Sequence, residues 1–199
     1  MPSEPTAPQQ RMRSAERRRQ ILDAAIEIVG RRGYYGFSVQ EVAARCGLTV
    51  AGVLHHVGTK DQLLLALLDE RDRRDAEAVP GLLASEEGER PGLARLRALV
   101  ARNSTQPELV RLYSMLRTES LYEEHPAHGY FLARERRVLA LFARCVAGEV
   151  GEEEAGPVAR QLLALMGGLE EQWLRSGRSF DLVEQWDLAV ARLLPAAGR

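Results

Sequence analysis

Apolar residues recur every three or four positions along most of this chain, and that spacing predicts helices. The clearest case is the segment 17–32, where residues such as Ile21, Ala25 and Ile28 share one broad face. Similar segments begin near residues 59, 93, 107, 125, 157 and 181, with loops predicted at 80–92, 120–126 and 148–156. No segment alternates apolar and polar residues as a strand does. The pattern therefore predicts an all-α chain of about nine helices.

Residues 38–47 carry the start and stop signals of a short helix. Ser38 is a favourable N-cap, and Glu41 three residues later completes the pattern of a capping box. Val42 gives this helix an inward position. Gly47 adopts a positive φ at little cost, so it is the predicted C-terminal stop.

A second short helix is predicted over residues 50–56. Thr49 caps its start, Gly58 ends it, and Thr59 with Gln62 forms another capping box that opens the next helix. Two short helices joined by a tight glycine turn form a helix-turn-helix. Such a unit can place its second helix in the major groove of DNA.

Charge is distributed unevenly along the chain. The whole sequence has a net charge of −1, but residues 1–60 carry nine basic and five acidic side chains. A basic front domain on an acidic body suits a module that faces phosphates. The arginine run around Arg17 would ordinarily be a solvated surface, but its place before the helix-turn-helix favours a phosphate or minor-groove contact. Residues 1–13 lack an apolar period and are predicted to form a disordered arm.

Residues 17–63 resemble the DNA-binding domain of the tetracycline-repressor (TetR) family of transcription regulators. The residues that carry the resemblance are Ile21, Ala24, Ala25, Gly33, Tyr34, Phe37, Ser38, Val39, Val42, Ala43, Gly47, Leu48, Thr49, His56, Thr59, Lys60 and Leu63. The chain departs from the family where it has Ala51 for the usual Gly, Leu54 for Tyr and Val57 for Phe. That Tyr often contacts a DNA phosphate in the family, so Leu54 implies altered DNA contacts.

The resemblance implies a helix-turn-helix domain over residues 14–60 and a helical ligand-binding and dimerisation domain over residues 61–199. It also implies a homodimer that binds a double-stranded DNA operator, most simply a repressor that a small-molecule effector releases. A transcriptional activator has the same fold and remains an alternative. A second alternative is a helical small-molecule-binding protein or enzyme that keeps its helix-turn-helix as a scaffold.

The predicted DNA contacts lie on and around the second short helix. Val50 can touch a thymine methyl group, and His55 can reach a base edge or a phosphate. Ser38 can donate to a phosphate or act only as a cap, and the resemblance makes Lys60 a phosphate contact. The full set of candidates is Arg17, Ser38, Gln40, Arg45, Thr49, Val50, Gly52, His55, His56, Thr59 and Lys60.

The body carries aromatic and sulfur-containing residues that are either plain core or the lining of a ligand cavity. Because a regulator of this kind needs an effector, we predict a ligand cavity in the body. It would be lined by Tyr113, Met115, Tyr122, Phe131, Phe142, Met166 and Trp173. The last two helices are apolar on more than one side. By resemblance they form the dimer interface through Leu162, Leu165, Leu169, Trp186, Val190 and Leu193.

Other kinds of function find no support in the sequence. There is no Gly-rich phosphate loop, nucleophile elbow or metalloprotease motif, so neither a catalytic site nor a cofactor is predicted. Cys46 and Cys145 lack disulfide or metal spacing, and capping explains the acidic residues near His125 and His128 better than a metal site does, so no metal site is predicted. Without a signal peptide or a membrane-spanning run, we expect a cytoplasmic protein.

Overall fold

The computed structural model describes residues 7–78 and 92–194, and in these ranges it contains nine α-helices and no strand. The all-α prediction is therefore confirmed. Most of the loop predicted at 80–92 lies outside the described residues. The helices are α1 Ala7–Gly36, α2 Val39–Cys46, α3 Val50–Val57, α4 Lys60–Ala78, α5 Gly92–Ser104, α6 Pro107–Glu119, α7 His128–Val150, α8 Glu152–Arg175 and α9 Leu182–Leu193.

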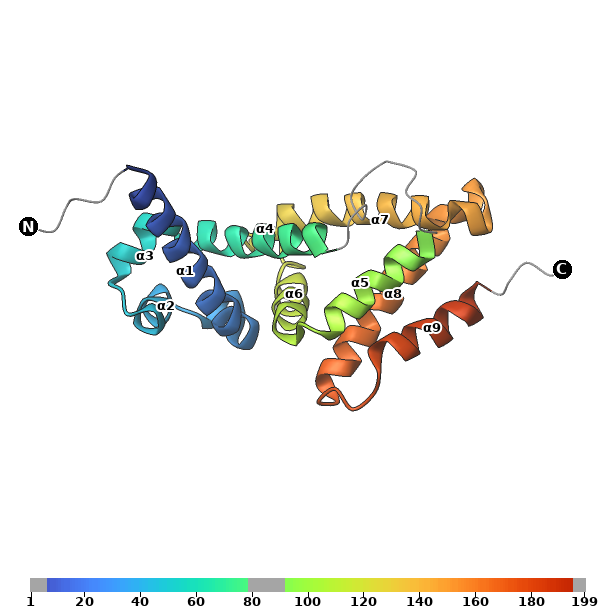
Figure 1. Cartoon of the computed structure of the whole chain (residues 1–199). Coiled ribbons are helices and arrows are strands. Elements are labelled where there is room, and N and C mark those ends of the chain that lie inside the picture. Colours follow the sequence, from blue (N-terminus) through green and yellow to red (C-terminus); the bar gives the residue numbers. More distant parts are fainter. Residues whose placement is uncertain (1–6, 79–91, 195–199) are drawn as a thin grey trace, which may run out of the picture.

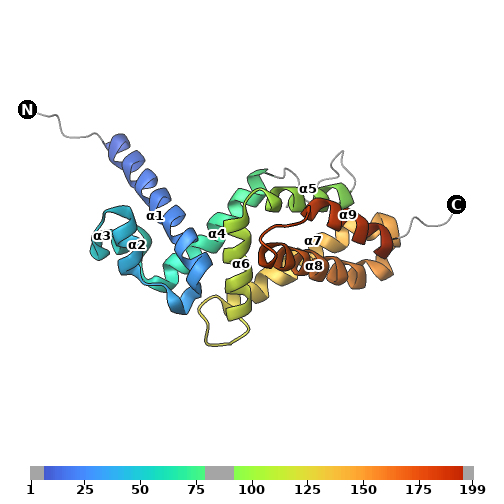
Figure 2. The same cartoon turned by 90° about the horizontal axis from the view of Figure 1, so that it is seen from below.

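The molecule has a small head at one end and a larger helical body (Figures 1 and 2). Helices α1, α2 and α3 form the head, and α4 runs from the head into the body, where it lies beside α7. Helices α7 and α8 pack along each other, while α5 and α9 close the far end of the body. A movement of α4 in the body would therefore be transmitted directly to the head.

The short helices of the head begin and end at their predicted caps. The Ser38 Oγ accepts from the Glu41 N–H over 3.2 Å, and the Thr49 Oγ1 accepts from the Gly52 N–H over 3.0 Å. Gly47 ends α2 with a φ of 64°. The first capping box is only half formed, because the Glu41 carboxylate instead pairs with Arg32 at 3.2 Å.

The second capping box is complete. The Thr59 N–H donates to Gln62 Oε1 over 2.8 Å, and the Gln62 N–H donates to Thr59 Oγ1 over 3.2 Å. This reciprocal pair fixes the point at which the chain leaves α3 and enters α4. The orientation of α4 is thereby tied to the end of the helix-turn-helix.

Helix α1 starts earlier than the pattern predicts. The disordered arm predicted for residues 1–13 is wrong for residues 7–13, which belong to α1, and residues 1–6 lie outside the described part of the chain. This segment is rich in Ala, Gln, Met and Arg, which favour helix, and Pro8 is tolerated in a first turn. Gly33 interrupts α1, with a φ of 68° and a ψ of −177°.

The buried apolar side chains form two clusters. The first joins the head to the start of the body, since Leu63 and Leu67 of α4 and Leu112 of α6 pack with Ile21 and Val53. The second fills the body around Phe142, Leu162 and Trp186. The predicted domain boundary after residue 60 thus falls within one continuous core, because the first half of α4 is shared by head and body.

The acidic loop predicted at residues 148–156 is wrong. Helix α7 continues to Val150 and α8 starts at Glu152, so Gly151 alone connects them with a φ of 82°. The glutamates of this segment form the first turn of α8, where negative charge suits the helix dipole. Pro157 consequently lies inside α8 and not in its first turn.

Candidate DNA-reading helix and effector cavity

Helix α3 presents one face to solvent at the outer end of the head. Val53 and Val57 point into the core, with exposed fractions of 0% and 6%. The exposed positions on the other side are Thr49, Ala51, Leu54 and His55. Both ends of the helix are capped, so this face is held in a fixed position relative to the head.

The predicted reading residues do not all lie on this face. Val50 packs against the head core, and Gly52 is half-buried below the Thr49 cap. His56 is half-buried, and its carbonyl accepts from the Arg18 guanidinium over 2.9 Å. Sequence reasoning missed Ala51 as an outward residue, although its spacing from the buried Val53 would have revealed it.

The predicted phosphate contacts surround α3 and several already have partners. The Lys60 ammonium lies 4.5 Å from the Tyr34 ring centroid and 4.6 Å from that of Phe37. Burial, reinforced by a hydrogen bond to Asp61, raises the pKa of Tyr34 to about 12, so this ring stays neutral beneath the lysine. The two aromatic rings hold a positive charge at the start of α4.

The other polar candidates of the head are exposed. Arg17 donates to Gln20 over 2.7 Å, and Arg45 pairs with Glu27 at 2.9 Å. Both pairs are at the surface, where they break at little cost in favour of a phosphate. The remaining candidates Ser38, Gln40 and Thr59 are also exposed.

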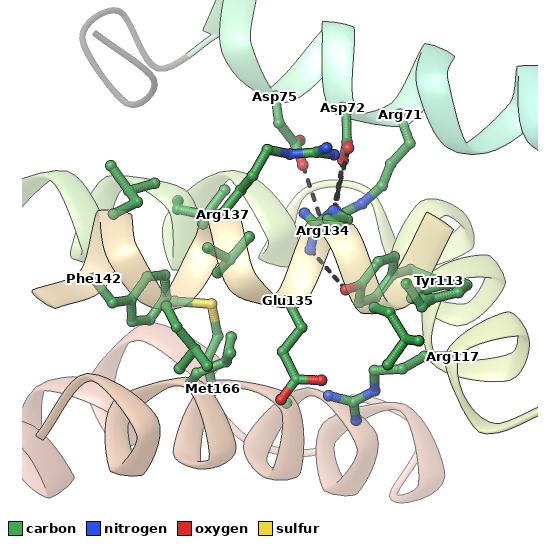
Figure 3. Close-up of a pocket in the computed structure, with 18 of the residues that line it drawn as sticks. Arg71, Asp72, Asp75, Tyr113, Arg117, Arg134, Glu135, Arg137, Phe142 and Met166 are labelled. Atoms are coloured by element: carbon green, nitrogen blue, oxygen red, sulfur yellow. Dashed lines mark hydrogen bonds and ion pairs between the residues drawn. The ribbon is translucent and has the colours of Figure 1, made fainter. Parts of the chain in front are cut away.

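The body contains a cavity of about 960 Å³ whose lining residues come from helices α4 to α8 and the α6–α7 connection (Figure 3). Four of the seven predicted ligand residues line it, namely Tyr113, Phe131, Phe142 and Met166. The apolar part of the wall also contains Leu99, Val138, Leu139, Leu141 and Leu163. The structure thus brings most of the predicted set together from three different helices.

The other three predicted ligand residues lie elsewhere. Met115 and Tyr122 are exposed at the surface, to 36% and 70%. Trp173 is buried, but in the second core cluster and not on the cavity wall. Sequence reasoning placed them by residue type alone, and type does not say which side of a helix faces a cavity.

A network of charged groups forms one end of the cavity (Figure 3). Arg134 donates to Asp72 over 2.9 Å and to the Tyr113 hydroxyl over 2.6 Å. Arg71 pairs with Asp75 at 3.3 Å, and the Arg71 and Arg134 guanidinium groups lie 4.1 and 4.6 Å from the Tyr113 ring centroid. Burial raises the pKa of Asp72, but Arg134 and its other partners outweigh burial and keep the net pKa below its ordinary value.

Glu170 lies on the cavity wall without an ion pair to a cation in the described chain. Asn103 donates to its carboxyl over 2.6 Å, and the two side chains are among the few buried polar ones. Burial raises the pKa of Glu170 above its ordinary value. The nearby Arg117 is occupied by Glu171 at 2.6 Å. The wall therefore carries a carboxyl group that favours its neutral form.

Three further arginines of the cavity lining, Arg137, Arg144 and Arg160, have exposed side chains. None of them has an ion pair with an acidic group in the part of the chain that the structure describes. Because their charges are uncompensated, they can attract an anionic group to the outer part of the cavity.

The predicted dimer residues divide into two groups. Leu162 and Trp186 are buried in the core of their own chain, at 0% and 2%, so assigning them to an interface is wrong. They occupy the inner stripes of α8 and α9, which the apolar pattern alone did not distinguish from the outer ones. The half-buried residues Leu165, Leu169, Val190 and Leu193 stay accessible.

The described ranges contain no group of three or more His, Cys, Asp or Glu side chains arranged to hold a metal ion. Cys46 and Cys145 are buried, unpaired thiols, and burial raises the pKa of each. Among the described helices, none has the length and apolar character needed to cross a bilayer.

Known proteins share both the head sequence and the whole fold. The family model of bacterial regulatory proteins of the tetR family matches residues 21–67, which cover the end of the first head helix, the helix-turn-helix and the start of α4. The head of the chain therefore has the DNA-binding domain of the TetR family. BetI, an HTH-type transcriptional regulator of Brucella anthropi, is 27% identical over 128 residues. That match covers 64% of this chain and 62% of BetI, so it spans less than two thirds of the relative.

Two solved structures have the same fold over most of their length. AibR, solved in complex with isovaleryl coenzyme A and operator DNA, has a TM-score of 0.70 and 24% identity, and the match covers 90% of this chain and 99% of AibR. FadR of Bacillus subtilis, solved with stearoyl-CoA, has a TM-score of 0.71 and 13% identity, covering 90% of this chain and 98% of FadR. At these identities the likeness establishes the fold alone.

Proposed function

We propose that this protein is a homodimeric, DNA-binding transcription regulator whose DNA affinity responds to a small molecule in the body cavity. The outward face of α3 carries this proposal, because Thr49, Ala51, Leu54 and His55 are presented by a helix capped at both ends. A regulator of this kind acts in the cytoplasm, where the DNA is, and we assign it no catalytic role.

The proposed dimer uses the outer faces of α8 and α9. Leu165, Leu169, Val190 and Leu193 remain half-buried in the single chain, and Gly168 faces open space. A two-fold dimer presents two copies of α3 to half-sites about 34–36 Å apart, one turn of DNA. A second copy of the chain packed on this apolar face would form a dimer with two heads, one for each half-site.

The proposed effector is an amphipathic anion of the acyl-CoA type. The apolar wall around Phe142 and Val138 suits an acyl chain, and the uncompensated Arg137, Arg144 and Arg160 suit an anionic head group. AibR and FadR, which share the fold, were solved with CoA thioesters. Repression relieved by such a ligand is the simplest outcome, because α4 both lines the cavity and starts at the Thr59 cap.

The DNA-binding part is tested by fluorescence anisotropy on the duplex that the protein selects from random sequence, with a scrambled duplex of equal length. Each of Arg17→Ala and Lys60→Met should weaken binding and lower the slope of log K against log salt by about 1, because one phosphate contact is lost. Arg136→Ala, at an exposed position of α7 outside the head and the proposed dimer face, is the matched control and should change neither. Failure to select any sequence, or equal weak binding to both duplexes, contradicts the proposal.

The effector class is tested by thermal unfolding with lauroyl-CoA, free CoA and dodecyltrimethylammonium. A ligand that binds only the folded protein raises the melting temperature. Lauroyl-CoA should do so most strongly, because only it offers both parts of the proposed ligand. Arg137→Glu should reduce that shift, while Arg136→Glu, an exposed neighbour outside the lining, should preserve it. A larger shift with the cationic amphiphile refutes the assignment.

A further inference from the structure

The head contacts the body at a second place, away from the axis of α4. At the end of α1 the Tyr34 backbone N–H donates to Glu119 Oε2 of α6 over 2.7 Å. Gly33 makes this approach possible, since a Cβ at that position would collide with the Glu119 carboxylate. One carboxylate of the body thus holds the end of the first head helix.

His125, in the connection between α6 and α7, lies against this carboxylate. Its side chain is completely buried, and its Nδ1 accepts from the Ala127 N–H over 3.2 Å. A neutral ring that accepts at Nδ1 carries its proton on Nε2. That Nε2 lies 3.7 Å from Glu119 Oε2, beyond hydrogen-bond length, and has no hydrogen-bond partner in the described chain.

The groups around His125 come from four helices. Glu119 and Asp61 face it from α6 and α4, and His128 lies at the start of α7. From α1 the Tyr34 and Tyr35 rings lie 5.1 and 5.8 Å from the imidazole, centroid to centroid. The Lys60 ammonium lies 4.5 Å from the centroid of the same Tyr34 ring.

This surrounding structure favours a neutral imidazole. Burial lowers the pKa of His125, Glu119 and Asp61 raise it, and the net pKa remains below its ordinary value. A second proton must also enter at Nδ1, where it would replace the hydrogen bond from Ala127. The closed connection is therefore compatible with the neutral ring and is disrupted by the imidazolium.

We propose that Glu119 and His125 form a proton-sensitive latch that holds the reading head against the body. With His125 neutral the latch is closed. When His125 takes up a proton, residues 120–127 move to hydrate the charge, Glu119 releases the Tyr34 N–H, and the head loses its fixed orientation. The effect on DNA rests on the proposed function, whereas the latch itself does not.

The latch is tested by amide hydrogen exchange of residues 33–37 in the full-length protein. His125→Asn keeps an acceptor for Ala127 but does not titrate, so wild type and variant are compared at the same pH. At about pH 8 the exchange rates of wild type and His125→Asn should match. At about pH 5.5 the wild type should exchange at least about fivefold faster, which is the lower end of the usual range for coupled sites. His128→Asn should behave like wild type. An unchanged ratio at the two pH values overturns the latch.

Glu119→Gln is the second variant, because it keeps an acceptor for the Tyr34 N–H but removes the charge that favours the imidazolium. The acceleration of amide exchange in residues 33–37 should therefore occur at lower pH in Glu119→Gln than in wild type. Acceleration at the same pH in both proteins overturns the role of Glu119.

The coupling to DNA is measured with the selected duplex as the ratio of the wild-type Kd to the His125→Asn Kd. Taking the ratio cancels the pH effects of the groups that both proteins share, including the two histidines of α3. The ratio should rise at least about fivefold between about pH 8 and about pH 5.5. A constant ratio with intact DNA binding overturns the coupling. If neither protein binds DNA while exchange still responds, the latch is supported and the proposed DNA-binding function is refuted.

Discussion

Asn103 donates a 2.6 Å hydrogen bond to Glu170, and the two side chains are exposed to only 2% and 6%. The hydrogen bond joins the end of α5 to the last third of α8 at the wall of the cavity. An amide can stabilise a carboxylate, but one neutral donor does not replace the water that burial removes. The pKa of Glu170 is raised because the hydrogen bond from Asn103 does not make up for the lost hydration.

The first prediction follows from the pKa of Glu170. Because it is raised above the ordinary 4.5, the folded state binds more protons than the unfolded state between those two values. The contribution of Glu170 to stability is therefore full below the ordinary pKa and falls as pH rises through the folded one. Glu170→Gln should remove this fall in urea unfolding measured across pH. Glu149→Gln, at an exposed position of α7, should leave the wild-type dependence intact.

The second prediction concerns the half-buried pair Arg134–Asp72, whose side chains are exposed to 14% and 28%. Removing one partner leaves a partly desolvated charge without its counter-ion, so Arg134→Met or Asp72→Asn should each lower the free energy of unfolding by about 1–3 kcal/mol. The double variant should cost less than the sum of the two single changes. A double-mutant cycle in urea measures this coupling. The exposed pair Arg97–Asp187 is the control and should couple by at most about 1 kcal/mol.

The third prediction concerns Leu54, which is exposed to 37% on the outward face of α3. Leu54→Tyr adds a hydroxyl group where the family usually has one, and should tighten binding to the selected duplex by up to about tenfold through one charge-assisted hydrogen bond. Anisotropy at fixed salt measures the change. Leu54→Phe adds the ring without the hydroxyl, and an equal gain for both variants would contradict the phosphate contact.

The fourth prediction tests the dimer. Gly168 of α8 has no atom within 4 Å of where a Cβ would lie, so Gly168→Arg should leave the single chain folded. The same arginine would obstruct and charge a face that packs on a second copy, and light scattering should then report a monomer. Gly148→Arg is the matched control, since Gly148 of α7 is equally open. An intact dimer with arginine at position 168 would place the interface elsewhere.

Local signals account for the parts that sequence reasoning predicted well. Ser38, Thr49 and Thr59 each cap a helix through a hydrogen bond from a backbone N–H three residues later, and Gly47 and Gly58 end helices by their own positive φ. Such interactions are complete within one turn of helix. They can be recognised without knowing where the rest of the chain lies.

The errors share one cause, which is that the pattern gives the type of a residue but not the neighbour it meets. Trp173 and Met115 are suitable for a cavity by type, yet one is packed in the core and the other lies at the surface. Leu162 belongs to an apolar stripe of α8 that its own chain already covers. Periodicity cannot separate two apolar stripes of one helix when both are buried in the final assembly.

The sequence by itself therefore determined the helices, their caps and the helix-turn-helix, because these depend on residues close together in the chain. Only the tertiary structure decided the cavity wall and the latch. The hydrogen bonds from Arg134 to Asp72, from Asn103 to Glu170 and from Tyr34 to Glu119 join residues 62, 67 and 85 positions apart. No local rule brings such residues together, because their meeting depends on how α1 and the helices α4 to α8 pack around shared cores.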